Sequence, residues 1–216
     1  GLESETAKIN RAVMSTSSLA LFYRNELIDA VFHSSSGGRT ENSGQVWKYQ
    51  LPYLKSVIDY DKNSTKYKWT NEFTPAELEK IFPSLGGINS IQIINKSSTD
   101  RVLKIRLYGI NGNKIISGTK IREKLQLPST KFEAYLKFKP IYLDNTLISQ
   151  DEMFDELVPQ SLPSIPKDYF LLVKGYGAGH GVGMSQWGAK SMAERGSSFR
   201  EILKHYYTGV QIRTYK

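Results

Sequence analysis

The segment Lys174-Gly175-Tyr176-Gly177-Ala178-Gly179-His180-Gly181-Val182-Gly183-Met184-Ser185-Gln186-Trp187-Gly188-Ala189 is central to the organisation of this chain. It continues a strand-like run at residues 169–174 and leads into a helical pattern at residues 185–195 that stops at Gly196. Because glycine has no Cβ, this composition allows tight turns and lets a ligand approach backbone amides. We therefore expect a strand, an accessible glycine-rich loop and a helix.

A second loop of small and polar residues, 33–42, follows another strand-like run at residues 27–32. This run is separated from residues 18–23 by Arg24-Asn25-Glu26, a spacing that predicts a β-hairpin. Alternation along residues 27–33 predicts that one set of side chains faces the core and the other points away. The expected core-facing set is Ile28, Ala30 and Phe32, and the opposite set is Leu27, Asp29, Val31 and His33.

The remaining patterns predict an α+β fold, with a β-rich main lobe and a smaller lobe of antiparallel sheet in the middle of the chain. A capping box at Thr74-Pro75-Ala76-Glu77 and another at Ser198-Phe199-Arg200-Glu201 each begin a helix. The other expected elements are a short helix at residues 6–14 and strands at 88–95, 101–109 and 114–117. The expected lobes are residues 1–60 with 168–216, and residues 61–138, with an irregular proline-rich insertion at 139–167.

Composition limits the classes of partner. The 216 residues are 39% hydrophobic and 12% aromatic, which is enough to form a folded core. The net charge of +8 favours anionic partners, but the basic residues are scattered and carry no nucleic-acid-binding motif, so we expect no nucleic acid. No apolar run approaches the roughly 20 residues that span a bilayer. The first residue is Gly1 rather than Met, so membrane contact is expected only through a removed N-terminal segment.

The two loops carry the side chains expected to bind a ligand. Hydroxyls and amides supply the hydrogen bonds that sugars need, and aromatic rings stack on sugar faces. The aromatic candidates are Trp47, Tyr53, Tyr176 and Trp187. The structural alternative is that the glycines only form turns and that His33 and His180 are hydrogen-bonded core residues, as we expect for His205 on its helix.

Other chemistries fit less well. A phosphate loop would need a Gly-Lys-Ser/Thr ending, which is absent. A serine hydrolase would pair one of residues 34–36 with His180, but there is no Gly-x-Ser-x-Gly elbow. A zinc site would use His33 and His180 with a carboxylate, yet no His-Glu-x-x-His spacing exists and cysteine is absent. We therefore expect no metal and no cofactor.

Cleavage of a glycosidic bond requires a carboxyl group that protonates the leaving oxygen. Glu41 is the best local candidate, although a weak one. Its alternative roles are capping a neighbouring backbone amide or pairing with Arg39. Asp59, Asp61 and Glu5 have less reason to face a groove.

Several of these segments resemble the family of stage II sporulation protein D and the LytB amidase enhancer. The resemblance rests on residues 28–42 with Val46-Trp47 and Leu51-Pro52-Tyr53-Leu54, on residues 179–189 with Met192-Ala193 and Gly196, on residues 202–209, and more weakly on 121–132. It covers nearly the whole chain except about residues 137–167.

The resemblance implies an extracytoplasmic protein that acts on peptidoglycan. Sporulation members are lytic transglycosylases that cut peptide-free glycan strands, and LytB-type members modify a wall amidase. The family's catalytic glutamate lies in an upstream segment of the type Glu-x-x-Lys-x-Gln-Ala, which this chain lacks, and zinc, which some members bind there, is not carried over. Residues 1–5 are expected to correspond to the stretch just after that segment.

We therefore expect a glycan-strand-binding domain of a lytic transglycosylase-like protein, with peptidoglycan and a wall amidase as partners. The alternative is a noncatalytic amidase enhancer. The residues expected to line the glycan groove are His33, Ser34, Ser35, Ser36, Gly37, Gly38, Thr40, Glu41, Trp47, Tyr53, His180, Gly181, Ser185 and Gln186.

Overall fold

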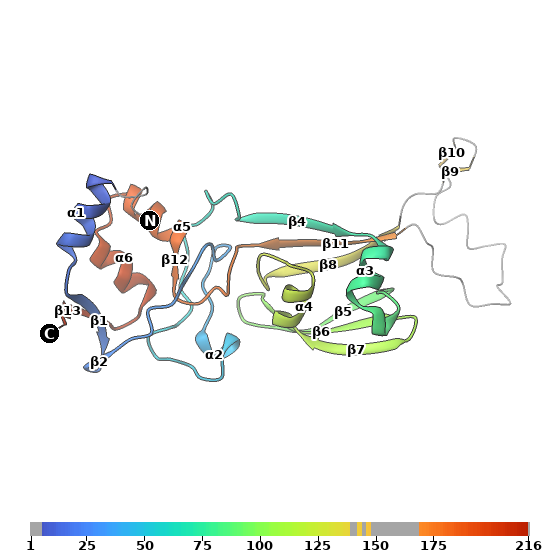
Figure 1. The fold of residues 1–216 in the computed structure, drawn as a ribbon, viewed down its shortest axis with the longest axis horizontal. Coiled ribbons are helices and arrows are strands. Elements are labelled where there is room, and N and C mark those ends of the chain that lie inside the picture. The colour runs from blue at the N-terminus through green and yellow to red at the C-terminus, as the bar shows by residue number, and fades with distance from the viewer. Residues whose placement is uncertain (1–5, 139–141, 144–145, 148–168, 216) are drawn as a thin grey trace. The chain divides into compact units, whose positions relative to one another are not determined.

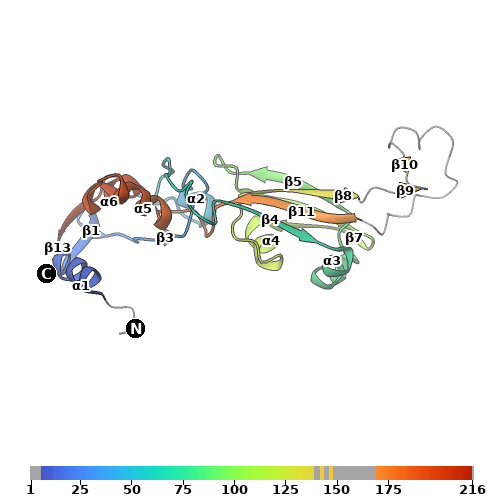
Figure 2. The same cartoon turned by 90° about the horizontal axis from the view of Figure 1, so that it is seen from above.

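The structure is a computed structural model that describes residues 6–138, 142–143, 146–147 and 169–215. Its backbone separates into two compact units, Gly1–Tyr67 with Ala178–Lys216, and Lys68–Gly177. Figures 1 and 2 show helices and short strands in the first unit and mostly strands in the second. The predicted α+β class is confirmed.

The first unit is formed by both ends of the chain. A three-stranded antiparallel sheet has the order β13-β1-β2, and β3 pairs in parallel with β12. Helices α5 and α6 contribute to its core, in which Ile202, Tyr206 and Val182 are buried. The elements are α1 (Ala7–Ser15), β1 (Leu19–Tyr23), β2 (Glu26–Leu27), β3 (Phe32–His33), α2 (Ser43–Val46), β12 (Met184–Ser185), α5 (Gln186–Glu194), α6 (Phe199–Tyr206) and β13 (Gln211–Thr214).

The second unit contains two three-stranded antiparallel sheets, ordered β4-β11-β8 and β5-β6-β7. Helices α3 and α4 lie on the same side of these strands in Figure 2, and Leu78 and Ile121 from them join one core with Leu107 and Val173. The elements are β4 (Lys68–Phe73), α3 (Pro75–Ile81), η2 (Pro83–Leu85), β5 (Ser90–Lys96), β6 (Val102–Gly109), β7 (Gly112–Ser117), α4 (Gly118–Lys124), β8 (Phe132–Phe138), β9 (Tyr142–Leu143), β10 (Thr146–Leu147) and β11 (Tyr169–Tyr176).

Helix starts follow the predicted capping chemistry. The Thr74 side chain accepts a hydrogen bond from the Glu77 amide, and the Glu77 carboxylate accepts one from the Thr74 amide. Ser198 and Glu201 form the same reciprocal pair at the start of α6. These bonds satisfy amides that the first helical turn leaves without partners, so both predicted helices are confirmed.

The predicted strand over residues 27–32 is wrong, although the hairpin before it is present. Strand β2 ends at Leu27, and only Phe32 and His33 return to a strand, where they pair with β12. The expected orientation holds at Leu27, which is 52% exposed, and at Ile28, which packs against the core. It is reversed at the end of the run, where Phe32 is 57% exposed and His33 is only 4% exposed. The partner of this short strand comes from residues 184–185, so local alternation did not determine which face points inward.

Strand β11 lies at the centre of the sheet in the second unit, between β4 and β8. Residues 169–177 therefore belong to that unit, whereas the sequence had grouped them with the ends of the chain. Most of the proline-rich insertion at 139–167, and residues 1–5, lie outside the described residues. Among the helices that the structure describes, none has the length and apolar character needed to cross a membrane.

Candidate functional site

The two loops singled out in the sequence meet within the first unit. The Ser35 amide donates to Ala178 O at 3.0 Å and the Ala178 amide returns a bond to Ser35 O at 2.7 Å. The Glu41 amide donates to Gly181 O at 2.8 Å. Gly179 has a φ of +107°, and an added Cβ would lie 2.7 Å from His33 Cβ, so glycine is needed where the loops approach most closely.

Asp61 holds the first loop from inside. Its Oδ2 accepts bonds from Ser35 Oγ at 2.5 Å and from the Gly37 amide at 2.8 Å, and its Oδ1 accepts one from the Gly38 amide at 2.9 Å. The Asp61 side chain is fully buried. A buried carboxylate costs free energy unless it is hydrogen-bonded, and here three donors compensate its burial and hold the loop backbone in one conformation.

Asp59 joins the same loop to two helices. Its Oδ2 accepts a bond from Ser36 Oγ at 2.6 Å, and its Oδ1 accepts bonds from Tyr206 Oη on α6 at 2.6 Å and from the Tyr60 amide at 2.9 Å. A Cβ on Gly188 of α5 would overlap both Asp59 Oδ1 and Tyr206 Oη, well inside the 3.0 Å that real Cβ contacts respect. The Gly188 position thus makes room for the carboxylate.

The partners of His33 determine where its protons are. Its Nδ1 lies 3.0 Å from Val182 O, which can only accept, so Nδ1 carries a hydrogen. Its Nε2 lies 2.9 Å from Ser36 Oγ, whose single hydrogen is donated to Asp59. If Nε2 also donates, to Ser36 Oγ, the hydrogen bonds from His33 through Ser36 to the Asp59 carboxylate are all satisfied. This arrangement predicts that His33 is an imidazolium cation paired with Asp59 through Ser36.

His180 has the opposite arrangement. Its Nδ1 accepts a bond from the Val182 amide at 3.1 Å and its Nε2 donates to Phe32 O at 3.0 Å, which is the neutral tautomer. Its ring centroid lies 5.4 Å from that of His33 on one side and 5.3 Å from that of Trp47 on the other. Trp47 is 40% exposed, so the buried network supports a partly exposed aromatic surface formed by His180 and Trp47.

The predicted groove residues divide into a group that is exposed or half-buried and a group that is buried. Trp47 and Gln186 are exposed, and Ser34, Gly38 and His180 are half-buried. Ser185 is buried as the N-cap of α5, where its side chain accepts the Gly188 amide bond. The buried group comprises His33, Ser35, Ser36, Gly37, Thr40, Glu41, Tyr53, Gly181 and Ser185. Which of the predicted residues contact a glycan remains a prediction, and the buried side chains are placed to shape the surface.

Two of the predicted site residues, Glu41 and Tyr53, are buried among protein groups. Glu41 is fully buried, and its Oε1 accepts a bond from the next amide, that of Asn42, at 2.8 Å. This is the capping role that the sequence left as an alternative. Tyr53 is 9% exposed and packs in the core, with its ring centroid 5.6 Å from that of Tyr23. Its face is therefore covered by protein rather than open to a sugar.

The hydrolase alternative is not supported by this arrangement. In a catalytic triad the histidine lies between serine and carboxylate, whereas here Ser36 lies between His33 and Asp59 and donates to the carboxylate. Ser36 is also fully buried. For a zinc ion, His33 and His180 offer no ready lone pair, because each ring nitrogen bonds a protein atom.

The sequence patterns do not mark the residues that organise the site. Asp59 and Asp61 were considered only as weak acids, and Tyr206 and Gly188 were not singled out. A usable signal was present, because a loop rich in hydroxyls and amides needs buried acceptors and the Asp59-Tyr60-Asp61 spacing supplies two on one side of an extended segment. Burial and the adjacent Asp59 charge raise the pKa of the Tyr206 phenol, which therefore stays a donor.

The chain is similar to curated proteins over nearly its whole length, although no protein-family model matches it. It is 37% identical to stage II sporulation protein D of Bacillus subtilis (strain 168) over 97% of this chain and 52% of that protein. It is 37% identical to stage II sporulation protein D of Bacillus amyloliquefaciens over 95% of this chain and 51% of that protein.

The amidase enhancer of Bacillus subtilis (strain 168) is 29% identical over 98% of this chain and 33% of that protein. The chain thus spans about half the length of the two sporulation proteins. The matches include both loops that form the buried network, since they cover almost every residue of the chain. The chain belongs to the family of stage II sporulation protein D and the amidase enhancer.

Proposed function

We propose that this chain is the glycan-strand-binding part of an extracytoplasmic, lytic transglycosylase-like protein that remodels peptidoglycan. The observation that carries the proposal is the exposed indole of Trp47, packed 5.3 Å from His180 on a loop framework held by buried carboxylates. A flat aromatic ring beside backbone amides suits a sugar face with its surrounding hydroxyls. Family membership supplies the context of the cell wall.

The catalytic acid is proposed to come from outside the residues of this site. The three carboxylates around the loops, Glu41, Asp59 and Asp61, are at most 5% exposed and each accepts a hydrogen bond from the protein. A general acid must come within hydrogen-bond reach of the glycosidic oxygen. In the proposed mechanism an upstream glutamate of the full-length protein protonates that oxygen and then accepts the proton of the sugar's 6-hydroxyl, which closes the anhydro ring.

Binding is tested with peptide-free glycan strands and purified chain, by co-sedimentation. Trp47→Ala is expected to weaken binding about tenfold, since an aromatic contact contributes on the order of 1–1.5 kcal/mol. Tyr49→Ala is the matched control, because Tyr49 is 67% exposed, lies two residues away and makes no ring contact with a histidine among the described residues. Equal losses in both variants, or no binding by the unchanged chain, would contradict the proposal.

Catalysis is tested separately in the full-length parent, by mass spectrometry for anhydro-muramic ends. Anhydro products from the parent and none from this chain are expected. Substitution of the parent's upstream glutamate by glutamine should abolish the products and leave binding intact. Products from this chain alone would refute the assignment of the acid.

A noncatalytic role is the second candidate, and the buried state of all three site carboxylates together with the similarity to an amidase enhancer favours it. In that case the chain binds the wall and stimulates an amidase. The distinguishing measurement is the rate of peptide release from purified peptidoglycan by a wall amidase, with and without the chain. An increased rate without anhydro products from the parent supports this second role.

A further inference from the structure

The outward face of the sheet β4-β11-β8 in the second unit carries a cluster of tyrosines and lysines. Residues directly opposite on antiparallel strands share a face, and Lys174 of β11 lies opposite Glu133 of β8. Their neighbours Phe132 and Val173 are in the core, so Lys174 and Glu133 point away from it. Tyr135 on β8 is also exposed, at 43%. This face therefore carries polar and aromatic side chains at the surface, with one buried apolar residue, Leu172, opposite Tyr135.

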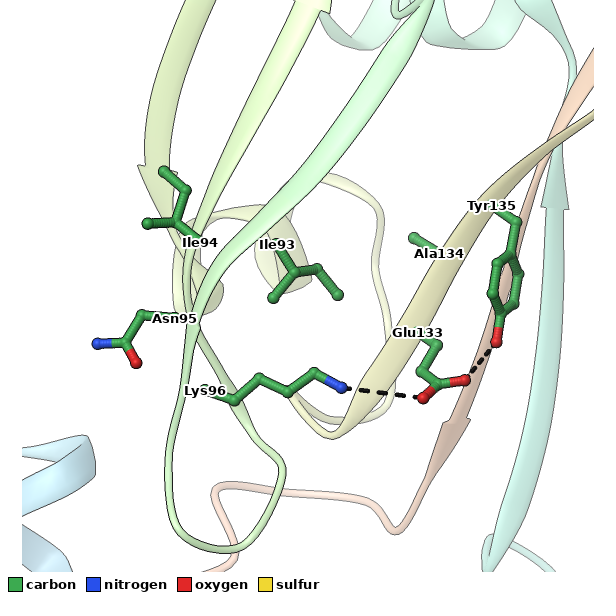
Figure 3. Close-up of a pocket in the computed structure, with 7 residues that line it drawn as sticks. All are labelled: Ile93, Ile94, Asn95, Lys96, Glu133, Ala134 and Tyr135. Carbon is green, nitrogen blue, oxygen red and sulfur yellow. Dashed lines mark hydrogen bonds and ion pairs between the residues drawn. The ribbon is translucent and has the colours of Figure 1, made fainter.

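This face is hollowed where β5 and the loop after it approach β8. A cavity of about 340 Å³ is lined by three lysines, two acidic residues and three aromatic residues, namely Lys96, Lys131, Lys174, Asp100, Glu133, Phe132, Tyr135 and Tyr176. An adjoining cavity of about 390 Å³ shares Lys96, Glu133 and Tyr135. Figure 3 shows Lys96 reaching from β5 toward Glu133, with Tyr135 directed at the same carboxylate. The volume is at the lower end for ligand sites and is of the size of one substituted sugar ring.

The charge of this hollow favours an anion. Lys96 Nζ lies 3.9 Å from Glu133 Oε1, and Tyr135 donates to Glu133 Oε2. Among the ion pairs of the described residues, none involves Lys174. Lys68 Nζ lies 5.8 Å from the Tyr176 ring centroid and adds a further cation at the rim. The three lysines of the lining, with Lys68 at the rim, outnumber Asp100 and Glu133, and this excess of positive charge attracts a carboxylate ligand.

Stability does not account for this cluster. The Lys96 and Glu133 side chains are 31% and 61% exposed, and exposed pairs of this kind contribute less than about 1 kcal/mol. Tyr135 on the edge strand β8 and Tyr176 at the end of β11 keep 43% and 39% of their surface exposed. Exposed tyrosine rings beside amines are instead typical of surfaces that stack on a sugar and pair with its charged group.

We propose that this hollow binds an acidic sugar, with its carboxylate between Lys131 and Lys174, its ring on Tyr176 and its hydroxyls directed to Glu133. The hydrogen bond from Tyr135 leaves one Glu133 oxygen oriented toward Lys96 and fixes the carboxylate as an acceptor. The carboxylate sugar is either a muramic acid unit of a peptide-free strand or a uronic acid of another wall polysaccharide. This site belongs to the second unit and does not depend on the surface of Trp47 and His180.

The test is an NMR titration of the full chain with three disaccharide probes. The first is N-acetylglucosaminyl-N-acetylmuramic acid with a free lactyl carboxylate, the second is the same compound as its methylamide, and the third contains glucuronic acid. We expect shifts at residues 131–135 and 174–176 with the first probe and at least about fivefold weaker binding of the methylamide. Lys174→Gln should weaken binding of the acid at least about fivefold, whereas Lys137→Gln, on the same strand face but outside the hollow, should change it less than twofold.

The outcomes separate this site from the proposed glycan surface. Equal binding of the acid and its methylamide, or no shifts at the hollow, overturns the inference. Shifts confined to the loops of the first unit overturn it while supporting the proposed function. Binding at the hollow that Trp47→Ala leaves unchanged supports it even if the first unit binds no glycan. Binding of glucuronate as well assigns the hollow to acidic sugars in general, and binding of the muramic acid alone assigns it to peptide-free strands.

Discussion

The predicted protonation of His33 leads to a quantitative prediction about its coupling to Asp59. Ser36 Oγ lies 2.9 Å from His33 Nε2 and 2.6 Å from Asp59 Oδ2, so the two charged groups are at most about 5.5 Å apart. Coulomb's law with an effective dielectric constant of about 20 gives an attraction of about 3 kcal/mol. A neutral histidine in the same place would contribute only its hydrogen bond, on the order of 1 kcal/mol.

A double-mutant cycle measures this coupling. Asp59→Asn, His33→Gln and the double variant are compared with the unchanged chain by urea denaturation, followed by circular dichroism and tryptophan fluorescence. We expect a coupling free energy of about 2–3 kcal/mol. The matched control is the cycle of Asp59→Asn with His180→Gln, which should give less than about 1 kcal/mol, because His180 accepts at Nδ1 and is neutral. Equal coupling in the two cycles would refute the assignment.

A second measurement keeps the reasoning testable if Asp59→Asn does not fold. Nitrogen-15 NMR of the imidazole rings in the unchanged chain distinguishes the protonation states directly. At pH 7, both His33 ring nitrogens are expected to carry hydrogens, and His180 is expected to carry one on Nε2 alone. A neutral His33 would mean that the proton shared with Ser36 lies elsewhere in the network.

Three further predictions concern the packing, titration and capping of the first unit. Gly188→Ala should destabilise the chain by roughly 3 kcal/mol or more in urea denaturation, since its Cβ displaces the Asp59 carboxylate, and native stability would refute this packing. Burial raises the pKa of the Tyr207 phenol to about 12, above its value of about 10 in the unfolded chain. The stability that the neutral phenol contributes is therefore complete below about pH 10 and is lost as the pH rises from about 10 to about 12. Tyr207→Phe should make the fall in melting temperature over that pH range less steep. Ser198→Ala should cost about 1 kcal/mol by removing the cap of α6, and Ser197→Ala, just outside the helix, should leave the melting temperature nearly unchanged.

Local signals predicted the elements whose structure is determined within a few residues. The capping boxes at Thr74 and Ser198 bond the first amides of their own helices, and the turn around Gly112 connects two neighbouring strands. The helices and strands at these places are confirmed. The strands β4, β8 and β13 were missed, because their pairing partners are far away in the chain. The same reason explains the error at residues 27–33, where the partner of β3 is β12.

The sequence by itself determined the α+β class, the family resemblance and the two loops that form the candidate site. Only the tertiary structure decided that Asp59 and Asp61 hold those loops, that His33 points inward, and that Trp47 is left at the surface. The physical reason is the separation along the chain between the residues that interact. Helix caps, turns and loop composition depend on neighbours along the chain, whereas burial, hydrogen-bond direction and charge pairing depend on residues such as Tyr206 and Gly188 that approach only after folding.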